Sequence, residues 1–462
     1  MSPCEVLPAQ QPVASFSCGL QQLLHEFSVT PNGFLPDNLP LQRLPNSYYG
    51  PWETLIQDLP ALIENGTLRE KVDQLPVLST SFLHTEPEQR RAYVVLCFLA
   101  NGYIWGGKTA AQILPPPLTL PLLTISSLLG LPPIATYASF NLWNFSVAHP
   151  SSASSSSSFR NLDAVFSQHT FTGTVDESWF YSVSIAIEAS GATIIPAMLV
   201  ALDAASHNDF PRATAALEGF VSSVKHLETF LDRMDEKCDP EVFYHKIRPF
   251  LAGSKNMENA GLPKGVFYDE GEGKGEWRQL RGGSNGQSSL IQFFDVVLGV
   301  EHASNGGDGK GGVSFHEEIR GYMPRAHREF LEHVAGVFPG GMKGVLEGAA
   351  KARGEFKLAV GKEEAECVAA FQRATEQLAA FRGRHLRMVT RYIIIPARQA
   401  ASRAQMEESG VVNLATAPSA MRVTGEGEVA KVELTGTGGT ALLPFLKESR
   451  DETIRAGEIT CK

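Results

Sequence analysis

Apolar residues recur every three or four positions over long stretches of this 462-residue chain, and no other feature constrains its fold as strongly. This spacing gathers apolar side chains on one face of an α-helix, and such a face is buried in a folded protein. Thr174 and Glu177 form a capping-box pattern at the start of the first run, and Pro196 is expected to end it. Strand signals are few and short, so a mainly α fold is predicted, with helices in the runs 178–195, 213–235, 241–252, 287–302 and 364–395.

A nearly pure serine tract at 151–158 separates a proline-rich first part from a more helical second part. Such a tract cannot build a packed core and is typical of a flexible linker. The sequence therefore predicts a small N-terminal helical domain at 1–150, a linker at 151–160 and a larger all-α domain at 161–462. The glycine-rich segment 304–312 is interpreted as a loop, because no strand leads into it as a phosphate-binding motif requires.

The chain carries a formal net charge of −10, with 50 acidic and 40 basic residues. This charge does not suit nucleic acid, because backbone phosphates require clustered lysine and arginine. The uncharged segment 112–135 contains six prolines, whereas a membrane-spanning helix needs about 20 nearly uninterrupted apolar residues. The first twelve residues lack a basic stretch followed by an apolar one, so no signal peptide is expected. We therefore expect a cytoplasmic protein with neither a nucleic-acid nor a membrane partner.

Six cysteines and twelve histidines are the candidate metal ligands. The cysteines are scattered without a CxxC pair, which is typical of reduced thiols rather than of disulfides or a structural zinc site. His316 precedes two glutamates, but Arg320 stands where the zinc motif HExxH needs its second histidine. His245 and His333 lie in helical runs next to charged residues and are expected to be solvated.

His385 differs from the other histidines, because Phe381, Met388, Val389 and Tyr392 lie three, four or seven residues from it. These spacings place all five side chains on one helical face. A neutral imidazole on an apolar face, with one free nitrogen, suits axial ligation of a haem iron. A buried histidine that binds local partners in a helical core also fits the pattern, and it is the more common case.

Several stretches of the chain, taken together, match one family pattern in order over most of residues 90–450. The segment 384–396, RHLRMVTRYIIIP, is similar to a helix that carries a proximal haem histidine. The stretches GGSNGQSS at 282–289 and FDVVLG at 294–299 resemble GGSAGQSS and FDVLLG of the same family. That family is the indoleamine 2,3-dioxygenases, and the chain resembles a fungal-type member. Further similar stretches are YIWG at 103–106, LPPI at 131–134, RGYMPRAHR at 320–328 and GTGGT at 436–440.

The resemblance implies a haem-b enzyme that holds one haem per chain through His385, its proximal ligand. It also implies the reaction, in which both atoms of O2 are inserted across the indole C2–C3 bond of L-tryptophan to give N-formyl-L-kynurenine. This is the first step of the kynurenine pathway, which leads to NAD. The iron must be ferrous to bind O2, so an electron donor is implied, although the sequence does not identify it. The indole needs a flat apolar slot and anchors for the charges of the amino acid.

On the distal side, Phe180 and Ser184 match the family's distal phenylalanine and serine, and they lie four residues apart on one helix. Phe243 and Arg248 match a second distal helix, where the ring packs against indole and the guanidinium can bind the substrate carboxylate. Without the resemblance, the two phenylalanines would be ordinary core residues and Arg248 a surface charge. The implied catalytic residues are Ser184, Phe243 and Arg248, and the implied substrate contacts are Tyr137, Phe180, Phe243, Tyr244, Arg248 and Thr437.

On the haem side, Ser284 and Gly283 match a turn that lies near a haem propionate. Glycine lets the backbone approach closely and donate to an anion. Arg382 and Asp295 match a proximal pair that orients the haem side of the site and tunes the basicity of the iron ligand. Thr437 lies in the GTGGT loop, which closes over substrate in the family; without the resemblance it would be an ordinary surface loop. No distal histidine is implied.

Three residues depart from the pattern of the animal members. Tyr181 and Tyr244 replace phenylalanines and would add hydroxyl groups near the pocket, while Asn285 replaces an alanine. These departures leave open the affinity for L-tryptophan and the tolerance for D-tryptophan or other indoles. Two other functions stay open as well. One is a haem-binding paralogue of low activity that acts as a sensor or interaction protein, and the other is a helical scaffold without a cofactor.

Overall fold

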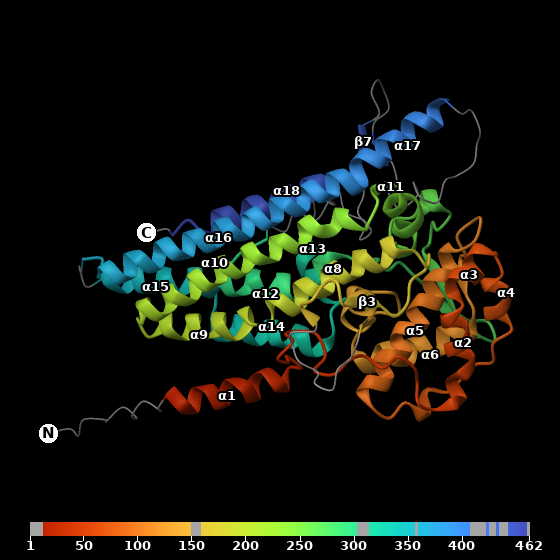
Figure 1. Cartoon of the computed structure of the whole chain (residues 1–462), viewed down its shortest axis with the longest axis horizontal. Helices are drawn as coiled ribbons and strands as arrows, with labels where there is room; N and C mark the ends of the chain where they lie inside the picture. The colour runs from red at the N-terminus through yellow and green to blue at the C-terminus, as the bar shows by residue number, and fades with distance from the viewer. Residues whose placement is uncertain are drawn as a thin grey trace.

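Helices make up most of the described chain, with only short strands beside them, which confirms the predicted mainly α fold (Figure 1). The serine tract, the segment 304–312 and Thr437 lie outside the described residues. The computed structural model describes residues 13–148, 159–302, 314–355, 359–406, 422–424, 431–433 and 442–459.

Helices α2 to α6 of the N-terminal part gather at one end of the molecule, whereas α1 lies apart from them (Figure 1). The longest, α5 (Glu86–Trp105), starts at a full capping box between Thr85 and Glu88, and most of its residues are buried. Helix α6 (Pro116–Leu129) packs against it with Pro121 inside the helix. The other helices of this part are α1 (Val13–Glu26), η1 (Ser47–Tyr49), α2 (Gly50–Gln57), α3 (Leu59–Glu64), α4 (Leu68–Asp73) and η2 (Thr80–Phe82).

Longer helices build the rest of the molecule. Helices α10 (Phe210–Asp232), α16 (Lys362–Val389) and α18 (Leu442–Ala456) run side by side along the long axis, with α16 packed against the other two (Figure 1). Helix α9 (Ile194–Ser206) packs on α10, and α8 (Val175–Gly191) also contacts α10. Further α-helices of this part are α12 (Ser289–Leu298), α13 (Phe315–Arg320), α14 (Arg325–Val337), α15 (Gly341–Glu355) and α17 (Ile395–Met406).

Short strands connect segments that are far apart in the sequence. Strand β1 (Ile113–Leu114) pairs in parallel with β4 (Val266–Gly271), which pairs with β5 (Lys274–Arg278) in an antiparallel hairpin. Strands β2 (Phe145–Val147) and β3 (Val165–Ser167) pair across the serine tract. A last antiparallel pair is β6 (Arg422–Thr424) with β7 (Lys431–Glu433).

One hydrophobic core extends from Val29 near the start of the described chain to Ala456 near its end. It includes residues on both sides of the serine tract, so the two parts of the chain share buried surface. The division into domains at 151–160 remains a prediction.

Helix α8 begins at the predicted N-cap, Thr174, but it does not extend to the predicted end at Pro196. The Thr174 side chain accepts a hydrogen bond from the Glu177 backbone N–H, as a capping box requires. The Glu177 carboxylate instead accepts from the backbone N–H groups of Phe171 and Thr172. The helix ends at Gly191, and Pro196 lies in the first turn of α9, so the prediction that Pro196 ends a helix was wrong. Proline is tolerated there because first-turn N–H groups have no partner within the helix.

The combined segment Val175–Ser206 is the one described helical stretch long and apolar enough to cross a membrane. In this protein, 72% of its most apolar window is buried inside the fold. Core helices of folded proteins pass the same test, so length and composition alone are weak evidence for a membrane span.

Three π-helical turns interrupt the helical runs of the described part of the chain. They are η3 (Ala138–Leu142), η5 (Phe243–Ile247) and η9 (Thr390–Ile394). The predicted run 241–252 is therefore not one regular helix, because α11 (Pro240–Val242) leads into η5 and then into the 3₁₀ turn η6 (Arg248–Leu251). Such turns occur often at functional sites, and all three contribute side chains to the cavity described next.

Candidate functional site

An apolar cavity lies between the long helices and the glycine-containing turn at 283–286. About 1820 Å³ inside it, its mouth included, is not filled by protein atoms. Apolar surface forms most of its wall, as in small-molecule and cofactor sites. The predicted site residues that line it are Tyr137, Phe180, Ser184, Phe243, Arg248, Gly283, Ser284, Asp295, Arg382 and His385.

His385 reaches the cavity from α16. Phe381, Met388, Val389 and Tyr392 line the cavity with it, so the helical face predicted from their spacing is present. Burial lowers the pKa of His385 to about 4, and the nearby charge of Arg382 acts in the same direction. The imidazole is therefore neutral at pH 7. Among the described residues, none forms a hydrogen bond with its ring.

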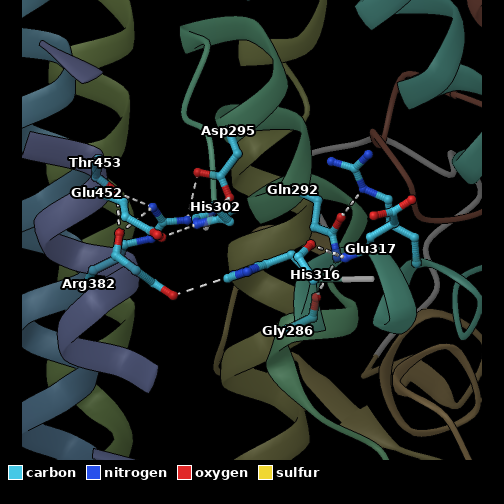
Figure 2. A network of polar contacts seen from close by, with 12 residues as sticks. Gly286, Gln292, Asp295, His302, His316, Glu317, Arg382, Glu452 and Thr453 are labelled. Carbon is cyan, nitrogen blue, oxygen red and sulfur yellow. Dashed lines mark hydrogen bonds and ion pairs between the residues drawn. The ribbon is translucent and has the colours of Figure 1, made fainter. Parts of the chain in front are cut away.

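One turn before His385, Arg382 forms a buried ion pair with Asp295 of α12. Its Nη2 atom lies 2.7 Å from each carboxylate oxygen (Figure 2). Its Nη1 donates to the Ser449 carbonyl of α18 at 3.2 Å. Burial alone would raise the pKa of Asp295, but Arg382 and His302 outweigh it and hold that pKa well below its usual range. The predicted pairing of Arg382 with Asp295 is thus present, and it joins three helices beside the cavity.

Figure 2 shows that His302 lies between two acidic side chains. Its Nε2 is 3.1 Å from Asp295, and its Nδ1 is 2.6 Å from Glu452 of α18. Its ring stacks on His316 with centroids 3.5 Å apart. His316 lines the cavity, and burial together with the charge of His302 lowers its pKa to about 3. Sequence reasoning missed this cluster, since its members come from three separate segments of the chain.

The glycines at 282 and 283 allow close packing around the turn. A Cβ on Gly282 would lie 2.2 Å from the Leu251 carbonyl oxygen, and one on Gly283 would lie 2.3 Å from the Phe140 ring. The chain after Arg248 therefore crosses this turn with backbone against backbone. Ser284 caps η8 (Asn285–Gln287) by accepting from the Gly286 N–H. Asn285 also lines the cavity, where the family pattern has alanine.

Two aromatic rings form another part of the wall. Phe180 of α8 and Phe243 of η5 pack with ring centroids 4.8 Å apart, and both line the cavity with Ser184. Tyr181 also lines the cavity, but its hydroxyl donates to the Glu177 carboxylate at 3.1 Å. The extra hydroxyl predicted near the pocket is thus bound to a buried carboxylate.

Arg248 is fully buried and lines the cavity, so it is not the surface charge that its sequence context alone suggests. Burial lowers its pKa to about 10, and it is still charged at pH 7. Tyr244 does not line the cavity. It packs against Ala397 and Ala400 of α17 behind the wall, with the Arg248 guanidinium 5.6 Å from its ring centre. Neighbouring residues on a helix point in different directions, so Phe243 faces the cavity and Tyr244 does not. The cavity geometry therefore does not support the predicted contact between Tyr244 and substrate.

A second feature that sequence reasoning missed is Glu188, a fully buried carboxyl group on α8. It accepts hydrogen bonds from the hydroxyl groups of Tyr137 at 3.0 Å and Ser288 at 2.6 Å. A glutamate within an apolar helical run is the one sequence signal that could have indicated a buried carboxyl group. Its partners could not be predicted, because they lie 51 and 100 residues away in the sequence.

These features define a helical protein with a large apolar cavity that contains a neutral histidine and a buried arginine. Comparison with known families specifies this class further, because the model of the indoleamine 2,3-dioxygenase family matches residues 23–456. The chain belongs to that family. It is therefore an oxidoreductase of the dioxygenase type, in a family of haem proteins of tryptophan catabolism.

Similar proteins extend over nearly the whole chain. An indoleamine 2,3-dioxygenase of Penicillium citrinum is 40% identical over 434 residues, which cover 92% of this chain and 86% of the relative. The indoleamine 2,3-dioxygenase of Saccharomyces cerevisiae is 39% identical and aligns over 95% of this chain and 94% of its own. A 6-hydroxytryptophan 2,3-dioxygenase of Fusarium equiseti is 35% identical, with 92% of this chain and 95% of the relative covered.

Proposed function

We propose that the chain binds one haem b through His385 and cleaves the indole C2–C3 bond of L-tryptophan with O2, giving N-formyl-L-kynurenine. The observation that carries this proposal is the state of His385. It is neutral, it faces an apolar cavity, and none of the described residues forms a hydrogen bond with it. A coordinating imidazole needs these properties, because it must offer a free nitrogen lone pair in a water-poor site.

The residues around His385 fit a haem. The cavity wall is mostly apolar, as a flat macrocycle requires, and Arg382 lies one turn away at its edge. Ser284 and the backbone of the adjacent turn are the proposed contacts for a propionate. When bound, the haem would supply the iron at which O2 is activated, and an external electron donor would keep that iron ferrous.

The distal side of the cavity fits an aromatic amino acid. Phe180 and Phe243 would hold the indole ring between apolar faces, and Ser184 would contact it from the same helix as Phe180. Arg248 would bind the substrate carboxylate through two parallel hydrogen bonds, which a buried guanidinium makes strong. Positioning of a neutral indole against O2 is the main task left to these residues.

Substrate choice within the indoles is a separate part of the proposal. The Fusarium equiseti relative is named for 6-hydroxytryptophan, so a ring-hydroxylated tryptophan is the second candidate substrate. Asn285 lines the cavity where the family pattern has alanine, and its amide could bind such a hydroxyl group. Competition between L-tryptophan and 6-hydroxytryptophan for the haem-loaded protein decides between them. A higher kcat/KM for 6-hydroxytryptophan would contradict L-tryptophan as the preferred substrate.

A comparison of two histidines tests the haem assignment. His385 and His316 both line the cavity, and both are neutral at pH 7. His385→Ala should abolish the haem Soret absorption after reconstitution, whereas His316→Ala should retain it. Equal haem affinity of parent and His385→Ala would overturn the proposal, as would loss of haem from His316→Ala alone.

A haem-binding sensor of low activity is one alternative. The joint placement of Phe180, Phe243 and Arg248 at the cavity favours an enzyme, since a haem sensor needs no substrate anchors. We also propose a cytoplasmic location, because Cys97, Cys238 and Cys367 are buried free thiols.

A further inference from the structure

His302 follows α12 in the chain, and none of the roles proposed above uses it. Its Nε2 lies 3.1 Å from the Asp295 carboxylate of α12, and its Nδ1 lies 2.6 Å from the Glu452 carboxylate of α18 (Figure 2). An ionised carboxylate can only accept a hydrogen bond, so both ring nitrogens must donate, and only the protonated ring has two N–H groups. The side chain is 8% exposed. His302 is therefore a buried cation held between two helices.

This cation lies close behind the cavity wall. The ring of His302 stacks on the ring of His316, with centroids 3.5 Å apart and the two planes inclined by 12°. His316 lines the cavity, as do Asp295 and Arg382. Arg382 binds the same carboxylate as His302 does, and it lies one helical turn before His385 on α16. The cation is thus one side chain away from the wall that carries the proposed iron ligand.

The charges of this cluster balance when His302 is protonated. Arg382 and His302 are the cations, and the carboxylates of Asp295 and Glu452 are the anions, at 4% and 5% exposure. His316 adds no charge, because burial and the charge of His302 lower its pKa to about 3. Loss of the proton from His302 would leave one negative charge without a partner beside the cavity. Water screens such a charge only weakly at a buried site.

We propose that His302 is a positioning residue whose positive charge balances the Asp295 and Glu452 carboxylates and thereby favours the ferrous state of a haem iron bound at His385. This inference rests on the proposed function, because it requires a haem at His385. Reduction adds one electron from the external donor to the iron, and a nearby positive charge stabilises the added electron. The one proton that moves is a solvent proton, which His302 takes up where its ring is neutral.

Titration of His302 gives this charge effect a pH dependence. Burial lowers the pKa of His302, but the two carboxylates outweigh burial and raise that pKa above 6.5. The other charged groups near the cluster are arginines, which keep their charge near neutral pH. They are Arg382 of α16, Arg320 of α13 and Arg455 of α18, the last of which lies 4.0 Å from Glu452 and is largely exposed. Among the described residues of the cluster, His302 is therefore the group that titrates near neutral pH.

The midpoint potential of the haem-loaded protein, measured as a function of pH, tests the proposal. The parent potential should be high below pH 6.5 and should fall as pH rises through the pKa of His302. We expect a step of about tenfold in the ferrous-to-ferric ratio, which corresponds to about 59 mV for one electron. The side chain in His302→Gln is uncharged at every pH. This variant should therefore show the lower potential throughout and lose the step.

His327→Gln is the matched control. His327 is also a buried histidine, at 2% exposure, but its Nδ1 lies 3.0 Å from the Ser289 hydroxyl and it does not line the cavity. Burial lowers the pKa of His327 to about 3, so its ring stays neutral over the pH range of the measurement. This variant should keep the step of the parent.

Glu452→Gln changes the same charge balance from the other helix and tests it even if His302→Gln does not fold. The new amide oxygen can still accept from the His302 ring, but one negative charge is gone. The step should move to lower pH, because the protonated ring loses part of its stabilisation. A parent potential independent of pH, or an unchanged step in either variant, would overturn the inference, while product formation from L-tryptophan would uphold the proposed function. A parent that binds no haem would overturn both.

Discussion

Arg382 and Asp295 are held together by one guanidinium nitrogen that lies 2.7 Å from both oxygens of the carboxylate. Both side chains are nearly buried, at 10% and 4% exposure. Arg382 belongs to the same helix as His385 and lies one turn before it. The pair therefore fixes α16 against α12 at the height of the proposed iron ligand.

Asp295→Asn should destabilise the protein strongly. The change leaves the Arg382 cation buried without its carboxylate, and breaking a buried pair in this way costs about 3–5 kcal/mol. Urea unfolding of the apo-protein measures the loss. The control is Glu218→Gln, because Glu218 pairs with Arg373 of the same helix α16 at the surface, where both side chains are about half exposed. That change should cost less than about 1 kcal/mol. Equal losses in the two variants would contradict the account.

Arg248→Gln should weaken tryptophan binding far more than haem binding. Loss of a charge-assisted hydrogen bond to the substrate carboxylate should raise the Kd of tryptophan roughly tenfold to a hundredfold. Titration of the apo-protein with haemin measures the haem affinity, and spectral titration of the haem-loaded protein with tryptophan measures the Kd of tryptophan. The control is Arg281→Gln, since Arg281 is also buried but pairs with Glu318 and does not line the cavity. An unchanged Kd of tryptophan in Arg248→Gln would remove Arg248 from the substrate site.

His302 should make stability depend on pH. Burial would lower its pKa, but the carboxylates of Asp295 and Glu452 outweigh this and raise it above 6.5. A raised folded-state pKa means that the stabilising charge is fully present below pH 6.5 and is lost as pH rises through the folded value. The Tm of the parent should therefore fall as pH increases above neutrality. His302→Gln should remove this fall in Tm. A steeper fall in the variant would show that folding lowers the pKa of His302 instead of raising it.

Gly282→Ala should destabilise the turn that carries Gly283 and Ser284. The new Cβ would meet backbone atoms at 2.2 Å and 2.4 Å, which cannot move as a flexible side chain can. Such overpacking costs about 1–3 kcal/mol. Gly286→Ala in the same turn is the control, because its Cβ would find its nearest neighbour at 3.4 Å. Thermal unfolding compares the two, and similar Tm values would contradict the close backbone crossing.

Helices could be predicted from the sequence where local signals act alone. The run that became α10, the cap at Thr174 and the face around His385 all follow from spacing within one helix. The π-helical turns could not be predicted, because a period of 3.6 does not reveal one extra residue in a turn. Pro196 was misread as a stop for a related reason, since proline suits the first turn of a helix as well as the residue after its end.

Side-chain partners distant in the sequence account for what was missed at the site. His302 meets Glu452 across 150 residues, and Glu188 meets Ser288 across 100. No spacing rule within one helix connects such pairs. The family pattern could supply Arg382, Asp295 and Phe243, because those residues belong to its motifs. It could not place Tyr244, whose direction depends on the local turn of η5 and on the packing of α17.

The central claim is tested most directly by one spectroscopic reaction. The haemin-reconstituted protein is reduced without oxygen, L-tryptophan and O2 are added, and the spectrum is followed with the concentration of N-formylkynurenine. The account predicts a haem Soret band and one N-formylkynurenine formed for each tryptophan consumed. A Soret band without product would contradict the dioxygenase activity proposed for tryptophan and favour a haem-binding paralogue. The absence of a Soret band would contradict the role of His385 and would favour a helical scaffold without a cofactor.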